Sequence, residues 1–344
     1  MSAMPPPHPP APTPPPRPAP PRPPCAGCDT GSDAALAPLL WLALALSMGA
    51  AVSLGVTRFA YGLLLPVMRE DLGWSYTLAG AMNTANALGY LVGALVTPRL
   101  IRRHGASSVL LAGAVLASGF MAASGFFTAP WPLMAQRTLA GAASALVFVA
   151  GGLMAARLGA RAPQHAGLLL GLYYGGTGWG IVASALGVPW LLGVGEAGAH
   201  AWAWAWWGLA LMCMLATLVL AWPAHSLQKE EPLAQAAPAP AANSSHKPLP
   251  WRRMALALAG YTLFGVGYIG YMTFVIALLR EQGVRPGAIT LFYALLGLAV
   301  VASARIWAGL LNRAKGGGAL ALLNALLGVA TVLPALTGAW PVVL

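Results

Sequence analysis

The feature that most constrains this chain is a series of apolar runs long enough to cross a lipid bilayer. A transmembrane helix needs roughly 20 consecutive, mainly apolar residues. Charged residues make up only 8% of the chain, whereas soluble domains average about 25%, so the chain has too little polar surface for a water-soluble particle. We therefore predict an all-α polytopic membrane protein with nine spans, at residues 37–66, 75–98, 106–128, 131–158, 165–193, 201–222, 253–279, 286–311 and 318–338.

The positive charges are distributed unevenly between the two sides of these spans. If the N-terminus is cytoplasmic, only Arg69, Arg280 and Arg285 lie outside, and Arg58, Arg137 and Arg305 lie within spans. The cytoplasmic side then holds thirteen of the 19 Lys and Arg residues: Arg17, Arg22, Arg99, Arg102, Arg103, Arg157, Arg161, Lys229, Lys247, Arg252, Arg253, Arg313 and Lys315. Cytoplasmic loops are enriched in Lys and Arg, so this orientation is favoured. The net charge of +11 then reflects topology, and we expect no nucleic-acid partner.

Composition divides the chain into four parts. Residues 1–35 form a Pro-rich tail that we expect to be disordered or polyproline II. Residues 36–222 hold six spans, and residues 252–344 hold three. Between them, residues 223–251 are rich in Pro, Ala and Ser and are interpreted as a flexible cytoplasmic linker. The sequence thus predicts a six-helix bundle followed by an incomplete second bundle.

Nothing in the composition indicates a cofactor, a metal site or an enzyme. Cys25 and Cys28 form a CxxC in the tail, an isolated motif for which a plain tail is the preferred interpretation, and Cys213 is interpreted as an apolar filler. The predicted spans contain no Asp or Glu, and their single His is His165, at the first position of the fifth span. A membrane enzyme would need acid–base or metal-ligating groups there, and a proton-coupled carrier commonly uses such a group.

The chain repeats itself across the linker. Sliding the sequence by 210 positions places Gly55 on Gly265, Val56 on Val266, Tyr61 on Tyr271, Asp71 on Glu281 and Gly73 on Gly283 without a gap. Parallel repeats of this kind are typical of transporters built from two bundles.

Polar residues are concentrated in six of the nine spans. Spans three, six and nine contain no Tyr and no charged residue, which is the pattern expected of spans that face only lipid. From the other spans we select these candidate substrate-binding residues: Arg58, Tyr61, Asn83, Asn86, Tyr90, Arg137, Tyr173, Tyr268 and Tyr271. The alternative for each residue is that it joins helices by hydrogen bonds and packing.

Helical spacing places several of these side chains together. Asn83, Asn86 and Tyr90 are three and four residues apart and share one helix face. A second face, by the same argument, holds Tyr261, Phe264, Tyr268 and Tyr271. At the outer end of the sixth span, a cluster interpreted as an interfacial aromatic belt consists of Trp202, Trp204, Trp206 and Trp207.

Arginine inside a span suggests an anionic ligand. A charge at the bilayer centre costs roughly 2.5–3.5 kcal/mol on insertion scales, and Arg58 lies about 12 Å along the helix from Pro66. The guanidinium presents planar donors suited to carboxylate or phosphate. The alternatives for Arg58 and Arg137 are snorkelling or bonding to helix carbonyls, and snorkelling is the preferred interpretation for Arg305.

Local motifs resemble those of the major facilitator superfamily. The stretch "PRLIRRHGAS" resembles its Gly-x-Leu-Ala-Asp-Arg-x-Gly loop through Arg103 and Gly105, although Arg102 replaces the Asp. The stretch "RTLAGAAS" resembles its Arg-x-x-x-Gly signature through Arg137 and Gly141. In "GLYYGGTGWG", which resembles the antiporter signature, glycine replaces the usual proline.

A closer resemblance, over residues 37–344, is to the YbfB/YjiJ-type branch, through "RFAYGLLLPVMREDLG", "GYLVGAL" and "GYIGYMTFVIALLREQG". It implies a monomeric secondary active transporter of the bacterial inner (plasma) membrane, with a cytoplasmic N-terminus, that moves a small organic solute by alternating access. Members generally have twelve spans, so a chain with nine resembles a truncated one. Two alternatives stay open: a non-transporting remnant of such a carrier, and a drug or toxicant efflux carrier.

Overall fold

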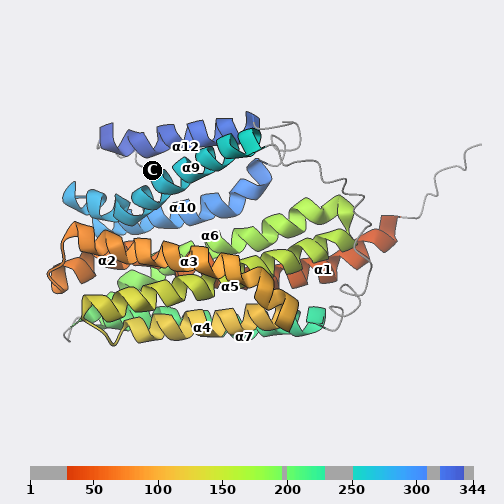
Figure 1. Cartoon of the computed structure of the whole chain (residues 1–344), viewed down its shortest axis with the longest axis horizontal. Coiled ribbons are helices and arrows are strands. Elements are labelled where there is room, and N and C mark those ends of the chain that lie inside the picture. Colours follow the sequence, from red (N-terminus) through yellow and green to blue (C-terminus); the bar gives the residue numbers. More distant parts are fainter. Residues whose placement is uncertain (1–28, 196–199, 229–250, 308–317, 337–344) are drawn as a thin grey trace, which may run out of the picture.

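The computed structural model describes residues 29–195, 200–228, 251–307 and 318–336, and within these ranges every regular element is a helix. In chain order the elements are α1 (Asp29–Ala50), the π-helix η1 (Ala51–Val56), α2 (Ala60–Asp71), α3 (Tyr76–His104), α4 (Ala106–Ser124), α5 (Pro130–Arg161), the short 3₁₀ helix η2 (Pro163–His165), α6 (Ala166–Val194), α7 (Ala201–Gln228), α9 (Trp251–Glu281), α10 (Pro286–Ile306) and α12 (Gly318–Leu336). The long helices run side by side along the molecule (Figure 1). The two ends of the helices are called the Asp29 end and the Asp71 end below.

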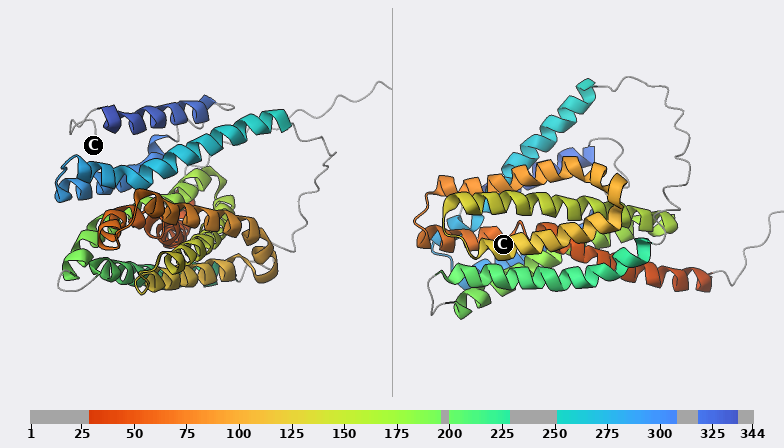
Figure 2. Two further views of the ribbon diagram at one scale, coloured as in Figure 1. Left: turned by 60° about the vertical axis from the view of Figure 1, so that its left-hand side comes forward. Right: turned by 60° about the horizontal axis from the view of Figure 1, so that its bottom comes forward.

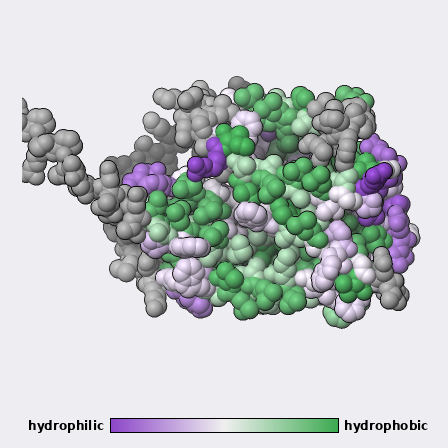
Figure 3. Space-filling view, turned by 180° about the vertical axis from the view of Figure 1, so that it is seen from behind, coloured by the Kyte–Doolittle hydropathy of each residue, from purple (hydrophilic) through white to green (hydrophobic). Residues whose placement is uncertain are grey.

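The described helices have the lengths and composition of membrane spans. Seven stretches are long and apolar enough to cross a bilayer, and α12 adds a shorter apolar stretch, Ala321–Val332. Helix α3 is 29 residues long but is less apolar, because it carries Asn83, Asn86 and Thr97, all buried against the protein. Figure 3 shows apolar side chains across the middle of one face and hydrophilic ones towards its two ends. The prediction of an all-α polytopic membrane protein is confirmed.

Two helices extend into segments that were predicted to be irregular. Helix α1 already begins at Asp29, inside the predicted tail, and α7 continues to Gln228, inside the predicted linker. The extra turns of α7 form because Ala224 and Leu227 are buried in an apolar cluster at the Asp29 end. The rest of the tail, including Cys25 and Cys28, and the rest of the linker lie outside the described residues.

The predicted repeat is visible in two equivalent turns at the Asp71 end. Gly73, between α2 and α3, has φ +63°, and Gly283, between α9 and α10, has φ +75°. In each turn an amide N–H donates to the carbonyl five residues earlier: Trp74 to Arg69 at 2.9 Å, and Val284 to Leu279 at 3.0 Å. This is the Schellman ending of a helix, which requires a left-handed residue that glycine supplies without a steric penalty.

Helix α9 joins the rest of the molecule mainly through its Asp71 half. There Val275, Ile276 and Leu279 are buried, whereas nearer the Asp29 end Leu256 and Leu263 are 78% and 73% exposed. Figure 2 shows that α9 leans away from the N-terminal helices towards its first residue, Trp251. Helix α10, in contrast, packs along α6.

Candidate functional site

The first predicted span is interrupted in its middle. Helix α1 stops at Ala50, the π-helix η1 follows, and α2 starts only at Ala60. The amides of Thr57 and Phe59 donate to Val52 and Leu54, each five residues back, at 3.1 and 3.2 Å. Such π-helical turns interrupt the regular i→i−4 ladder and often occur at functional sites. Arg58 therefore lies in the irregular turn that joins two regular α-helical segments of one long span, Leu36–Asp71.

The helices on both sides hold this break in place. On the α5 side, Ser53 Oγ donates to the Ser144 carbonyl at 2.9 Å, and Ser144 Oγ donates to the Ser53 carbonyl at 2.7 Å. On the α6 side, Gly55 and Gly180 let the two backbones touch. The break is thus a packed feature of the bundle.

Arg58 points its charge between aromatic rings of two different helices. Its Cζ lies 6.0 Å from the ring centroid of Tyr90 on α3 and 5.7 Å from that of Tyr268 on α9. All three side chains are partly exposed. Among the described residues, Arg58 has no hydrogen bond and no ion pair, so these cation–π contacts are its observed partners. Arg58, Tyr90 and Tyr268 are called the Arg58 cluster below.

More aromatic rings extend the cluster along α9. Phe59 meets Tyr268 edge-on at 6.0 Å, and Phe264 stacks on Tyr268 at 5.6 Å. Tyr261 continues the row, 5.8 Å from Phe264. Three of the four residues predicted to share this face, Tyr261, Phe264 and Tyr268, are therefore in contact along it. Phe59 was not among the selected residues, although its position next to Arg58 could have indicated it.

Arg137 lies away from this cluster, inside the N-terminal helices. Its side chain is 2% exposed, and its Cζ lies 4.7 Å from the ring centroid of Tyr61 and 5.4 Å from that of Trp206. Nη1 donates to the carbonyl oxygen of Thr57 at 3.2 Å. Nε and Nη2 are buried, with no hydrogen-bond partner among the described residues.

The two asparagines join helices. Asn83 Nδ2 donates to Thr273 Oγ1, which links α3 to α9, and its own Oδ1 is buried without a partner in the described part of the chain. Asn86 Nδ2 donates to the backbone carbonyl of Arg137 at 3.0 Å, which links α3 to α5. Thr273 was not selected from the sequence, because an isolated threonine in a span carries no distinctive signal.

The remaining selected tyrosines lie at helix contacts. Tyr61 donates from its hydroxyl to the Ala79 carbonyl at 2.8 Å and is 1% exposed. Tyr173 is fully buried between α6 and α5 and donates to the Phe148 carbonyl at 3.0 Å. Tyr271 packs against the larger apolar cluster. The structure thus brings together three of the nine selected residues, Arg58, Tyr90 and Tyr268, and places the other six at contacts between helices.

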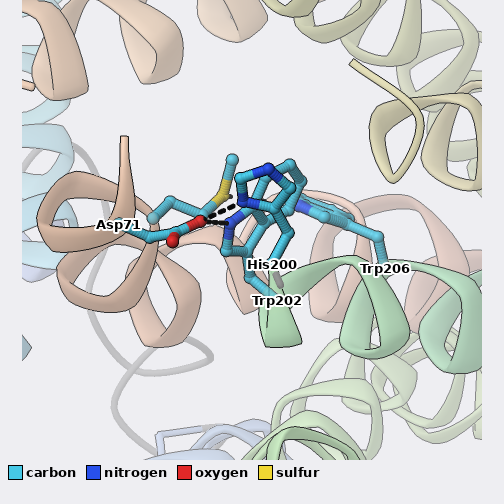
Figure 4. Close-up of polar contacts among 5 residues, drawn as sticks. Asp71, His200, Trp202 and Trp206 are labelled. Atoms are coloured by element: carbon cyan, nitrogen blue, oxygen red, sulfur yellow. Dashed lines mark hydrogen bonds and ion pairs between the residues drawn. The ribbon is translucent and has the colours of Figure 1, made fainter. Parts of the chain in front are cut away.

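Two polar clusters lie at the Asp71 end. In the first, Asp71 Oδ2 meets His200 Nδ1 and Trp202 Nε1, each at 2.5 Å (Figure 4). In the second, the Tyr76 hydroxyl donates to Glu281 Oε1 on α9, and the Arg69 Cζ lies 4.1 Å from the Tyr76 ring centroid. The second cluster ties the first repeat to the second.

The aromatic-belt interpretation is wrong for two of the four tryptophans. Trp202 and Trp206 are 1% and 0% exposed, because their N–H groups bond inward to Asp71 and to Met68 Sδ. Trp204 is 48% exposed, as expected of a tryptophan in an interfacial aromatic belt. Among the described residues, no three His, Cys, Asp or Glu side chains gather as metal ligands.

Comparison with known proteins identifies a transporter family. A family model described as the uncharacterised MFS-type transporter YbfB matches residues 50–344. No curated protein matches the chain significantly.

Proposed function

Because the chain belongs to this family of MFS-type transporters, we propose that it is a secondary active carrier that moves a small organic anion by alternating access. The observation that carries the proposal is Arg58, a cation at the middle of a span that faces Tyr90 and Tyr268 and has no anionic partner among the described residues. A charge in this position is costly unless a ligand or water compensates it.

The surroundings of Arg58 favour a carboxylate on an aromatic body. A guanidinium binds a carboxylate through two parallel hydrogen bonds. The rings of Phe59, Phe264 and Tyr268 offer an apolar and π-rich surface beside it. A benzoate-like anion satisfies both features, because its charge can face Arg58 while its ring packs on the aromatic row.

Alternating access is supported by unequal contacts at the two ends of the molecule. Towards the Asp71 end, α9 and α10 are joined to the N-terminal helices by Tyr76–Glu281, by Asn83–Thr273, and by the Tyr293 hydroxyl, 3.5 Å from the Phe59 carbonyl oxygen. Towards the Asp29 end, α9 is largely exposed. This arrangement fits a carrier closed on one side, whose two bundles rock against each other.

The orientation belongs to the same proposal. The Lys and Arg residues of the short loops, such as Arg102, Arg103 and Arg161, are at the Asp29 end. The positive-inside rule then places that end, the N-terminus and the 223–251 linker in the cytoplasm of a bacterium, with the protein in its inner membrane. We propose a monomer with the bilayer as its other partner.

The test uses the purified chain in liposomes with radiolabelled benzoate as the probe. We expect Arg58→Leu to insert at least as well as the original chain, since it removes a charge from the membrane interior, and to abolish benzoate exchange. Arg58→Lys keeps the charge but loses the bidentate geometry, and should weaken benzoate binding by about tenfold. Arg305→Leu is the matched control and should exchange benzoate almost normally.

Three results would count against the proposal. If Arg58→Leu exchanges benzoate normally while Arg305→Leu fails, Arg58 is structural. If the original chain exchanges tetraphenylphosphonium but not benzoate, the proposal of an anion carrier is wrong. The chain is then better explained as an efflux carrier for hydrophobic cations, which the aromatic row could bind by cation–π contacts. A chain that exchanges neither probe would support the non-transporting alternative.

A further inference from the structure

The most unusual buried group in the molecule is the guanidinium of Arg137. It is 2% exposed, and two of its nitrogens, Nε and Nη2, have no partner among the described residues. Burying a charge with unsatisfied donors costs several kcal/mol, and a well-packed apolar side chain of similar volume is often neutral or stabilising in such a place. Stability alone therefore gives a weak reason for an arginine at position 137.

The one hydrogen bond that the Arg137 side chain does make leads to the helix break. Nη1 donates to the Thr57 carbonyl at 3.2 Å. That carbonyl belongs to the planar peptide unit whose nitrogen is the amide of Arg58, so fixing its direction restrains the backbone of Arg58. The bond is charge-assisted and therefore stronger than a neutral one.

Arg137 is also linked to the Arg58 cluster through helix α3. Its ring contacts are Tyr61 on α2 and Trp206 on α7, and its backbone carbonyl accepts a bond from Asn86 at 3.0 Å. Asn86 lies four residues before Tyr90 on α3, so the two side chains share a helix face. One face of α3 therefore contacts Arg137 through Asn86 and Arg58 through Tyr90.

We infer that Arg137 is a positioning residue, which holds the turn at Thr57 so that Arg58 points between Tyr90 and Tyr268. The inference rests on the proposed role of Arg58 in binding the substrate. In this arrangement Arg137 does not touch the substrate. Its charge fixes the shape of the break, and the break directs the binding arginine.

A substrate-free experiment tests the geometry. In a chain whose Cys25, Cys28 and Cys213 are replaced by serine or alanine, Arg58→Cys provides a thiol in the break. Its rate of reaction with an anionic methanethiosulfonate reagent reports the direction and exposure of that position. We expect Arg137→Leu to change this rate by at least fivefold, and Arg137→Lys, which can still donate, to change it less.

Ser144→Ala is the matched control. It removes the bond from Ser144 Oγ to the Ser53 carbonyl, but it leaves the bond from Ser53 Oγ to the backbone carbonyl of residue 144 and the bond from Arg137 to the Thr57 carbonyl. We expect Ser144→Ala to lower the thermal midpoint and to leave labelling at position 58 within twofold. Arg137→Leu should show the opposite pattern, with a midpoint at least as high as that of the cysteine-substituted parent chain and altered labelling. If Arg137→Leu leaves the labelling unchanged, or if Ser144→Ala changes it equally, the inference is wrong.

Transport separates this inference from the proposed function. With Arg58 in place, Arg137→Leu should raise the half-saturating benzoate concentration by about tenfold, whereas in an Arg58→Lys background it should add little, because coupled residues are not additive. Full additivity of the two substitutions would overturn the positioning role. If the proposed function is wrong, Arg58→Leu should not change benzoate exchange. The effect of Arg137→Leu on labelling at position 58 would then be the same as predicted above.

Discussion

A Cβ atom built on Gly55 would lie 2.7 Å from the Cα atom of Gly180 and 2.6 Å from the carbonyl oxygen of Thr177. The π-helix η1 and helix α6 therefore pack backbone against backbone at the level of the helix break. A reciprocal contact exists from the other side, where a Cβ on Gly180 would lie 2.6 Å from the Ala51 carbonyl oxygen. Distances below 3 Å to backbone atoms leave no room for a methyl group.

We predict that Gly55→Ala destabilises the protein. The added methyl must separate η1 from α6, and overpacking of this kind typically costs about 1–3 kcal/mol. The measurement is the thermal unfolding midpoint in detergent, together with the amount of protein inserted in the membrane. Benzoate exchange should fall as well, because Arg58 is three residues further along the chain.

Gly187→Ala is the control for this prediction. Gly187 lies on the same helix as Gly180, and a Cβ there would meet no atom within 4 Å. Since alanine is the better helix former, the midpoint of Gly187→Ala should stay the same or rise slightly. Equal losses in Gly55→Ala and Gly187→Ala would contradict the packing argument.

Much of the fold could be predicted from the sequence, because a bilayer imposes simple rules. Length and hydropathy located seven stretches that the structure also shows as helices long and apolar enough to cross a bilayer, because a helix satisfies its own backbone hydrogen bonds in lipid. The repeat was found from pairs such as Gly73 and Gly283, and the structure adds that both of these glycines have positive φ in equivalent turns. The family could be recognised from local motifs and matches residues 50–344.

The side-chain arrangement could be predicted only in part. Tyr90 and Tyr268 were selected for their polarity within spans, and they do meet Arg58. Tyr173 was selected for the same reason, but its hydroxyl donates to a backbone carbonyl of α5. Sequence spacing shows which residues share a helix face, but it does not show which other helix that face contacts. The π-helix at Ala51–Val56 contains no proline and gave no local signal. It depends on contacts with α5 and α6, which are distant in sequence.

The Asp71 cluster gives a second prediction. Trp202 Nε1 and His200 Nδ1 both reach Asp71 Oδ2 at 2.5 Å, so Asp71 fastens the start of α7 to the end of α2. A double-mutant cycle with Asp71→Asn and Trp202→Phe should give a coupling free energy of about 0.5–1.5 kcal/mol in thermal or denaturant unfolding. The same cycle with Glu70→Gln in place of Asp71→Asn should give none, since no bond between Glu70 and Trp202 is present in the described chain.

Topology gives a third prediction. Reporter fusions after Gly105, after Arg161 and within the 223–251 linker should report the cytoplasm, because these segments lie on the Lys- and Arg-rich side. Fusions near Glu196 and Glu281 should report the outside. Neutralising Arg102 and Arg103 together should weaken this preference in the fusion after Gly105. A linker that reports the outside would reverse the assignment of both ends.

The last prediction concerns the contact between the two repeats at the Asp71 end. The Tyr76 hydroxyl donates to Glu281, while Arg69 lies 4.1 Å above the Tyr76 ring. Tyr76→Phe keeps the ring for Arg69 and removes only the hydroxyl, so it should weaken closure at this end without disturbing the start of α3. A hydrogen bond of this kind contributes about 1 kcal/mol, which corresponds to roughly a fivefold change in the balance between closed and open forms.

That balance can be measured by the distance between spin labels at Thr77→Cys and Gln282→Cys, in the chain without its other cysteines. Both positions are exposed, one on α3 and one directly after α9. Tyr76→Phe and Glu281→Ala should each increase the long-distance fraction about fivefold, and the double variant should add nothing further, because each change removes the same bond. Tyr174→Phe, which alters an exposed tyrosine of α6, is the control and should leave the distribution unchanged. If the short distance persists in Tyr76→Phe, closure at the Asp71 end depends on the buried contacts Asn83–Thr273 and Tyr293–Phe59, and the surface bond is not part of it.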